Sequence, residues 1–346
     1  MKILQLSIIT IVILALLVFY VPWISKTPKP DHDIFFVKKG ESLKQVITNL
    51  KKENRIRNSS FLYYSLRLLG THKRLKSGQY RLNGSESIAN FNTLFSEGRY
   101  ETRSLTIPEG YSNKRIALIL KKYGLDSLKF MQIQSDESLL KKYSISAKNT
   151  EGYLLPNTYE VNYDISELEL TELLLKAQQS VWTEKMDADI KSRNLTRHKI
   201  LTIASIIEGE AMVESEMPRI SGVYWNRILK GIPLGADPTI QYLIPNGPRR
   251  VLFKDLEIVS PYNTYRVKGL PPGPIGNPGV KSITAAIYPE KHNYLYFVAD
   301  GFGGHVFTKS LIEHNKAKEK YDLIMKPRRE QEKKKAAQIT KQNGAM

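Results

Sequence analysis

The sequence contains no cysteine, and this absence excludes several classes of protein at once. A disulfide-stabilised scaffold, a zinc ribbon, an iron–sulfur protein and an enzyme with a catalytic thiol all require cysteine. Only six histidines occur in the 346 residues, and they are scattered without the H-E-x-x-H spacing of a zinc protease. We therefore expect neither a metal site nor a cofactor.

Acidic residues are scarce relative to basic ones. The chain has 34 Asp and Glu against 52 Lys and Arg, a formal net charge of +18. Such an excess suggests a polyanionic partner: nucleic acid, an anionic membrane surface or an acidic polymer outside the cell. The chain lacks a glycine-rich phosphate loop, zinc-finger spacing and an aromatic RNA-binding motif, so we expect no nucleic-acid partner. Part of the excess lies in a basic tail, residues 326–346, which we expect to be solvated.

Charged residues are absent from Ile3 to Ile24. A helix of this length is roughly 33 Å long, enough to cross the hydrocarbon core of a bilayer. A signal peptide is the alternative, but its apolar core is shorter and a small-residue cleavage site should follow. We predict a transmembrane anchor over residues 1–24 and a linker over 25–33. With only two residues before this stretch, nearly all of the chain would then lie on the far side of the membrane.

Residues 36–52 match residues 106–122 at a constant offset of seventy. Each copy is typical of a short strand, a glycine turn, a serine N-cap and an amphipathic helix. This order resembles a LysM-like glycan-binding module, which we expect over residues 34–125, although capped helices alone would give the same pattern. The glycines are Gly40 and Gly110, and the serines are Ser42 and Ser112.

An apolar helix is predicted over residues 198–212, and it carries only two acidic residues, Glu208 and Glu210. A carboxylate among apolar neighbours is poorly solvated, which raises its pKa and suits it to general acid catalysis. Helical periodicity does not choose between the two. The alternative is a helix that ends at Gly209 and exposes both carboxylates to water. Ser205 on the same helix lacks the G-x-S-x-G elbow of a serine hydrolase.

The segments that follow are rich in turn-forming and aromatic residues. Asp237 precedes a proline at an expected helix start, so it is either an N-cap or a pocket residue. Residues 260–283 should form a rigid wall of prolines and glycines, in which Tyr262 and Asn263 offer a ring face and an amide for a sugar. Residues 293–300 and 305–310 predict a hairpin before a last helix.

Residues 201–315 resemble the YceG-like proteins, also called the MltG family of endolytic murein transglycosylases. The resemblance rests on several pieces in order: ASIIEGEA, the following Glu216, GVYWNR, ADPT, SPYNTYR, GLPPGPIGNPG, YLYFVADGFGGHVF and EHN. It implies an α+β catalytic domain over residues 126–325 and places the catalytic glutamate at Glu208. Gly209 departs from the family, in which lysine is frequent there.

The resemblance also implies a reaction and partners. Such enzymes cut the MurNAc–GlcNAc bond of nascent peptidoglycan strands without water, leaving 1,6-anhydro ends. Glu208 would act as both acid and base, and Glu216, Asp237, Tyr262 and Asn263 would bind the sugar or orient Glu208. A complex with cell-wall synthases, the penicillin-binding proteins, is expected as well. The alternative function is a noncatalytic, membrane-anchored peptidoglycan-binding scaffold.

Overall fold

The computed structural model describes residues 8–16, 33–84, 86–98, 102–245, 247 and 249–343. Residues 8–16 are helical, and the remainder of the expected anchor and the linker up to residue 32 lie outside the described residues. Among the residues described, the helices are either too short or too polar to cross a bilayer. The chain divides into two compact units, Met1–Leu105 with Thr158–Ser166, and Thr106–Asn157 with Glu167–Met346.

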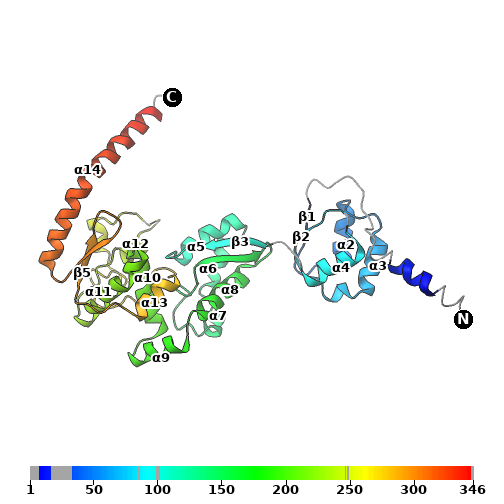
Figure 1. Ribbon diagram of the computed structural model, residues 1–346, viewed down its shortest axis with the longest axis horizontal. Helices are drawn as coiled ribbons and strands as arrows, with labels where there is room; N and C mark the ends of the chain where they lie inside the picture. The colour runs from blue at the N-terminus through cyan, green and yellow to red at the C-terminus, as the bar shows by residue number, and fades with distance from the viewer. Residues whose placement is uncertain are drawn as a thin grey trace. The chain divides into compact units, whose positions relative to one another are not determined.

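The first unit is a small α+β body in which α2, α3 and α4 lie beside the β1–β2 sheet (Figure 1). The two strands are antiparallel, with Phe35 opposite Tyr80, and both of these rings are buried with the apolar faces of the helices. The elements are β1 (Ile34–Val37), α2 (Leu43–Lys52), α3 (Ser59–Leu68), a 3-10 turn (Thr71–Lys73), β2 (Gly78–Arg81) and α4 (Ile88–Glu97).

A second two-stranded sheet joins β3 (Thr102–Ile107) to β4 (Asn157–Asn162), and the boundary between the units runs through both strands. Glu160 of β4 accepts hydrogen bonds from the hydroxyls of Thr102 and Ser104 in β3. The sheet is therefore tied together by side chains as well as by its backbone.

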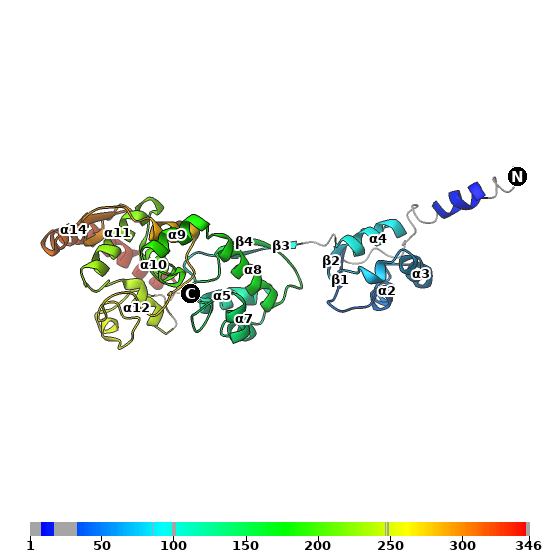
Figure 2. The same ribbon diagram turned by 90° about the horizontal axis from the view of Figure 1, so that it is seen from below.

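The second unit is mainly helical, and Figure 2 shows α10 (Arg197–Glu210) lying among α9, α11 and α12. Residues Ile200–Ile207 of this helix are all buried, which explains its lack of a polar face. Helices α11, α12 and α13 contact it directly. The remaining elements are α5 (Asn113–Leu120), α6 (Ser127–Ile133), α7 (Glu137–Lys142), α8 (Glu167–Ser180), α9 (Glu184–Ser192), α10 (Arg197–Glu210), α11 (Met217–Leu229), α12 (Asp237–Leu243), α13 (Val280–Ile287), β5 (Tyr296–Ala299), β6 (His305–Thr308) and α14 (Leu311–Asn343), with 3-10 turns at Lys121–Tyr123, Glu214–Glu216 and Phe253–Glu257.

The two repeat copies have the predicted local structure. Ser42 caps α2 and Ser112 caps α5, each accepting a hydrogen bond from the backbone three residues on. Gly40 and Gly110 have φ angles of 83° and 71°, the left-handed region that glycine occupies without strain. The first copy belongs to the first unit and residues 106–122 belong to the second, so the copies lie in different bodies.

Several expectations for the second unit can be compared with its structure. Strands β5 and β6 pair antiparallel, which confirms the hairpin, and α14 follows it and continues through the expected tail as far as Asn343. The wall expected over residues 260–283 ends at Gly279, because Val280 already begins α13. The N-cap of α12 is Ala236 rather than Asp237, so the capping role for Asp237 is wrong. The proline at position 238 stands in the first turn, where its missing N–H costs no helical hydrogen bond.

Candidate active site

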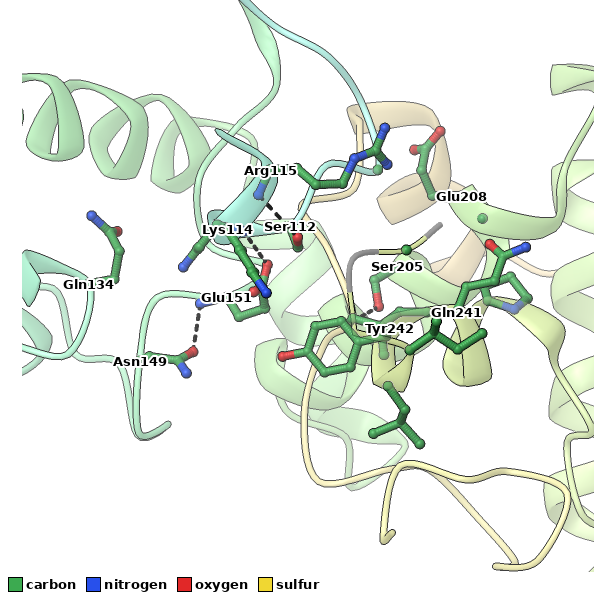
Figure 3. A pocket seen from close by; sticks show the side chains of 18 of the residues that line it. Ser112, Lys114, Arg115, Gln134, Asn149, Glu151, Ser205, Glu208, Gln241 and Tyr242 are labelled. Atoms are coloured by element: carbon green, nitrogen blue, oxygen red, sulfur yellow. Dashed lines mark hydrogen bonds between the residues drawn. The ribbon is translucent and has the colours of Figure 1, made fainter. Parts of the chain in front are cut away.

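A cavity of about 850 Å³ opens within the second unit (Figure 3). Its lining comes from stretches that are far apart in the sequence: the β3–α5 turn and α5, the α6–α8 region, the end of α10, and α12 with the loop after it. The volume falls within the range of about 300–1,000 Å³ that is usual for ligand sites. Lining residues with polar or charged side chains include Glu109, Lys114, Arg115, Gln134, Asn149, Glu151, Ser205, Glu208 and Gln241.

Glu208 lies in the last turn of α10 and faces this cavity. Its Oε2 atom accepts hydrogen bonds from the backbone N–H of Gly279, at 2.9 Å, and from the hydroxyl of Ser282, at 2.6 Å. Gly279 is the N-cap of α13, and the positive end of a helix favours a nearby carboxylate. These two donors fix the carboxyl group in one orientation at the cavity wall.

A second carboxyl group, that of Glu109, lies beside Glu208. It is so close to Gly279 that a Cβ atom built there would overlap a Glu109 oxygen. Burial and the charges of Glu208 and Glu214 raise the pKa of Glu109, and only Lys281 acts in the opposite direction. Glu109 was not among the site residues expected from the sequence. The sequence did contain one indication, a change of charge between the two repeat copies, because Glu109 stands where the first copy has Lys39.

Glu210 points away from the cavity and contacts Tyr224 of α11, whose hydroxyl donates to Oε1 at 3.0 Å. Burial and the charge of Asp237 raise the pKa of Glu210 to about 7, against the effect of the Tyr224 hydrogen bond. Helix α10 includes both glutamates and neither is fully exposed, so the expectation of a helix ending at Gly209 with two solvated carboxylates is wrong. The two acids have separate surroundings, and only Glu208 lines the cavity.

The other four residues expected to contact substrate do not line this cavity. Glu216 accepts hydrogen bonds from the backbone N–H of His305 at 3.1 Å and pairs with its Nδ1 atom at 2.6 Å, which ties the start of α11 to β6. Asp237 accepts a 2.5 Å hydrogen bond from the hydroxyl of Tyr265. Both carboxylates therefore connect elements of the fold.

Tyr262 and Asn263 also have partners within the wall. The Tyr262 ring packs against that of Tyr242, with centroids 5.2 Å apart, and Tyr242 is a cavity residue. Asn263 is fully buried, and its amide donates to the carbonyls of Leu256 and Ile258. Asn263 thus holds the loop that carries Tyr262 next to the cavity edge.

Ser205 lines the cavity but is 3% exposed and already bonded, donating to the Thr202 carbonyl and accepting from the Ile275 N–H. This arrangement joins α10 to the wall and gives the hydroxyl no base. Within the described part of the chain, no three His, Asp or Glu side chains gather as a metal site would need.

Asn277 connects the segments around the cavity. Its side-chain amide donates to the Tyr111 carbonyl at 2.8 Å and to Asn113 Oδ1 at 3.0 Å, and its Oδ1 accepts from the Leu154 N–H at 2.9 Å. Asn277 itself is fully buried. One side chain therefore joins the second repeat copy, the loop before β4 and the proline-rich wall.

Known proteins resemble this chain over most of its length. The YceG-like family matches residues 35–320. The endolytic murein transglycosylase of Bacillus subtilis is 36% identical over 302 residues, covering 82% of each chain. The protein of that name from Streptococcus pneumoniae is 29% identical over 78% of this chain, which spans 55% of that longer protein.

A solved structure gives the same relationship. The crystal structure of a YceG-like protein from Listeria monocytogenes is 34% identical and superposes with a TM-score of 0.57 over 82% of this chain and 98% of that one. Sequence and structure agree with the resemblance carried by the motifs between residues 201 and 315. The chain belongs to the YceG-like family.

Proposed function

We propose that this protein is an endolytic lytic transglycosylase that cuts the MurNAc–GlcNAc bond of peptidoglycan strands, with Glu208 as its acid and base. The observation that carries the proposal is the placement of Glu208, a carboxyl group held in one orientation at the wall of a large cavity. Relatives named endolytic murein transglycosylase, 36% and 29% identical to this chain, support the same enzyme class.

The proposed chemistry needs one carboxyl group that first gives and then takes a proton. Glu208 protonates the glycosidic oxygen as the bond to C1 of the muramic acid breaks, and the GlcNAc leaves with a new hydroxyl. The 6-hydroxyl of the same muramic acid then attacks C1 and returns its proton to Glu208. The product is a 1,6-anhydro ring, no water is consumed, and the enzyme ends in its starting state.

The hydrogen bonds of Glu208 suit this double role. Gly279 and Ser282 both bind Oε2, and the structure shows no partner for Oε1 among the described residues, so Oε1 is the atom that we assign to proton transfer. A carboxyl group that is anchored through one oxygen stays in reach of both the leaving oxygen and the 6-hydroxyl. The substrate's acetamido group can stabilise the intermediate, as in substrate-assisted glycosidases.

The test compares Glu208→Gln with Glu210→Gln, a change of the same kind two residues along the same helix. Purified uncrosslinked glycan strands are incubated with each protein, and the products are identified by mass spectrometry. Glu208→Gln should lose at least about 100-fold in anhydro-ended products, because general acid–base catalysis contributes that much. Glu210→Gln should remain active. Undiminished cleavage by Glu208→Gln would refute the assignment. Strand lengths that stay unchanged with the natural protein and with both variants would favour the alternative function, a noncatalytic peptidoglycan-binding scaffold.

We also propose that residues 1–24 anchor the protein in the cytoplasmic membrane, with the catalytic unit outside and near cell-wall synthases. The support is the uncharged stretch from Ile3 to Ile24 and the peptidoglycan substrate of the proposed reaction. Protease added to spheroplasts should degrade the folded part of the chain. Full protection in intact spheroplasts would contradict this orientation.

A further inference from the structure

Glu151 is a buried acid in the cavity wall that the proposed reaction does not use. It lies in the loop between α7 and β4, its exposure is 8%, and it lines the cavity. Its Oε1 atom accepts a 3.0 Å hydrogen bond from the backbone N–H of Asn113 and has a longer contact of 3.5 Å with the Asn277 amide. The backbone N–H of Glu151 donates to Asn149 Oδ1 (Figure 3), so the backbone and the carboxyl group of this residue are each hydrogen-bonded.

The second oxygen of Glu151 has no hydrogen-bond partner among the described residues. The titratable groups facing it are the phenols of Tyr242, from α12, and Tyr262, from the wall. Lys114 and Arg115 of α5 line the same cavity, and no ion pair joins either of them to Glu151 within the described part of the chain. Among the residues that the structure describes, no cation is therefore paired with the Glu151 carboxyl group.

The protonation state follows from these surroundings. Burial raises the pKa of Glu151 to about 8, although the Asn113 N–H acts in the opposite direction. The group is then mostly a neutral carboxylic acid at pH 7. Because Oε1 accepts the Asn113 hydrogen bond, the acidic proton lies on Oε2, the atom without a protein partner. A neutral acid is a hydrogen-bond donor, whereas a carboxylate only accepts.

We propose that Glu151 is a substrate-binding residue that donates a hydrogen bond from Oε2 to an uncharged oxygen of an N-acetylated sugar, such as the amide carbonyl. The identity of the ligand rests on the proposed function. Glu151 and Glu208 come from different elements and have separate partners, so a substitution at one leaves the hydrogen bonds of the other in place.

The experiment measures binding without turnover. Full-length Glu208→Gln protein in detergent is titrated with N-acetylglucosamine oligomers and with uncrosslinked glycan strands between pH 6 and 9.5. The affinity should be constant near pH 6 and should fall about tenfold by pH 9, because one unit above its pKa only about a tenth of a carboxyl group is protonated. The loss should follow the ionisation of Glu151 and not that of residue 208, which is now an amide.

Two further variants in the same Glu208→Gln background identify the group responsible. Glu151→Gln keeps an acceptor for Asn113 and an N–H donor in place of Oε2, so its affinity should be retained at pH 6.5 and should not fall at high pH. Glu151→Leu has no donor and should bind at least about tenfold more weakly than Glu151→Gln at every pH, as expected when a buried polar contact is lost. Thermal unfolding confirms that each variant is folded.

Several results would overturn the proposal. These are an affinity that does not change with pH in the Glu208→Gln protein, the same alkaline loss in Glu151→Gln, or no binding of either probe. The first measurement needs no change at residue 151, so it decides the matter even if those variants do not fold. A failure of catalysis to depend on Glu208 would refute the proposed reaction and leave these binding results to stand separately.

Discussion

The stability of the second unit should depend on pH through Glu210, and Glu210→Gln should remove that dependence. The pKa of this carboxyl group is about 7 in the folded chain, compared with 4.5 for an unperturbed glutamate, the value taken for the unfolded chain. Because the pKa is raised in the folded state, protonated Glu210 stabilises the fold. This contribution to the free energy of unfolding is complete below pH 4.5 and is lost as the pH rises through about 7. At about 1.4 kcal/mol for each unit of difference, the loss amounts to about 3 kcal/mol.

The variant should therefore match the natural protein below pH 4.5 and be more stable by about 3 kcal/mol at pH 8. Glutamine keeps the oxygen that accepts from Tyr224, so the packing of α10 on α11 is preserved. Urea unfolding at several pH values, followed by the fluorescence of Trp182 and Trp225, reports this unit. Glu319→Gln, at an exposed position of α14, is the control for the loss of one negative charge. A stability difference that is the same at pH 4 and pH 8 would refute the reasoning.

Two other substitutions test how the cavity is held together. Asn277→Ala should lower the free energy of unfolding by about 3 kcal/mol, because it leaves the Leu154 N–H buried without an acceptor. Urea unfolding measures this loss, and a loss under about 1 kcal/mol would contradict the role of Asn277. Gly152→Ala should cost about 2–4 kcal/mol, since Gly152 has a φ of 84° and an added Cβ would overlap Pro274. Gly124→Ala, at a φ of 72° with open space around it, isolates the backbone cost of about 1 kcal/mol. Equal melting temperatures for the two alanine variants would show that Pro274 moves aside freely.

Local features of the fold were predictable because their causes are local. The serine caps at Ser42 and Ser112 act within one turn of a helix, so a seventy-residue offset in the sequence reproduces the same strand–turn–helix twice. The hairpin was predicted from the alternation of residues along its two strands, and the buried helix α10 from its apolar content. Structure that depends on contacts between residues close together in the chain can therefore be predicted from the sequence.

The site was predictable only in part, because its contacts join distant residues. Periodicity left Glu208 and Glu210 equivalent, and they differ only in what α11 and α13 place opposite each. Glu151 gave no signal in the sequence, because the residues that its carboxyl group contacts, Asn113 and Asn277, are distant from it in the chain. Asn263 looked like a sugar ligand because an asparagine beside two tyrosines has that composition, whereas its amide is consumed by the loop itself.

The hydrogen bonds of Asn277 affect how the chain folds around the cavity. They connect Asn277 to Leu154 and to Tyr111, which lie 123 and 166 positions earlier in the chain. A partly synthesised chain that lacks the proline-rich wall therefore lacks these bonds around the cavity. Contacts of such long range form late and make folding slow. In the same way, Glu208 meets Gly279 across 71 residues. A chain that has not finished folding therefore lacks the arrangement of Glu208 and the cavity that the proposed reaction requires.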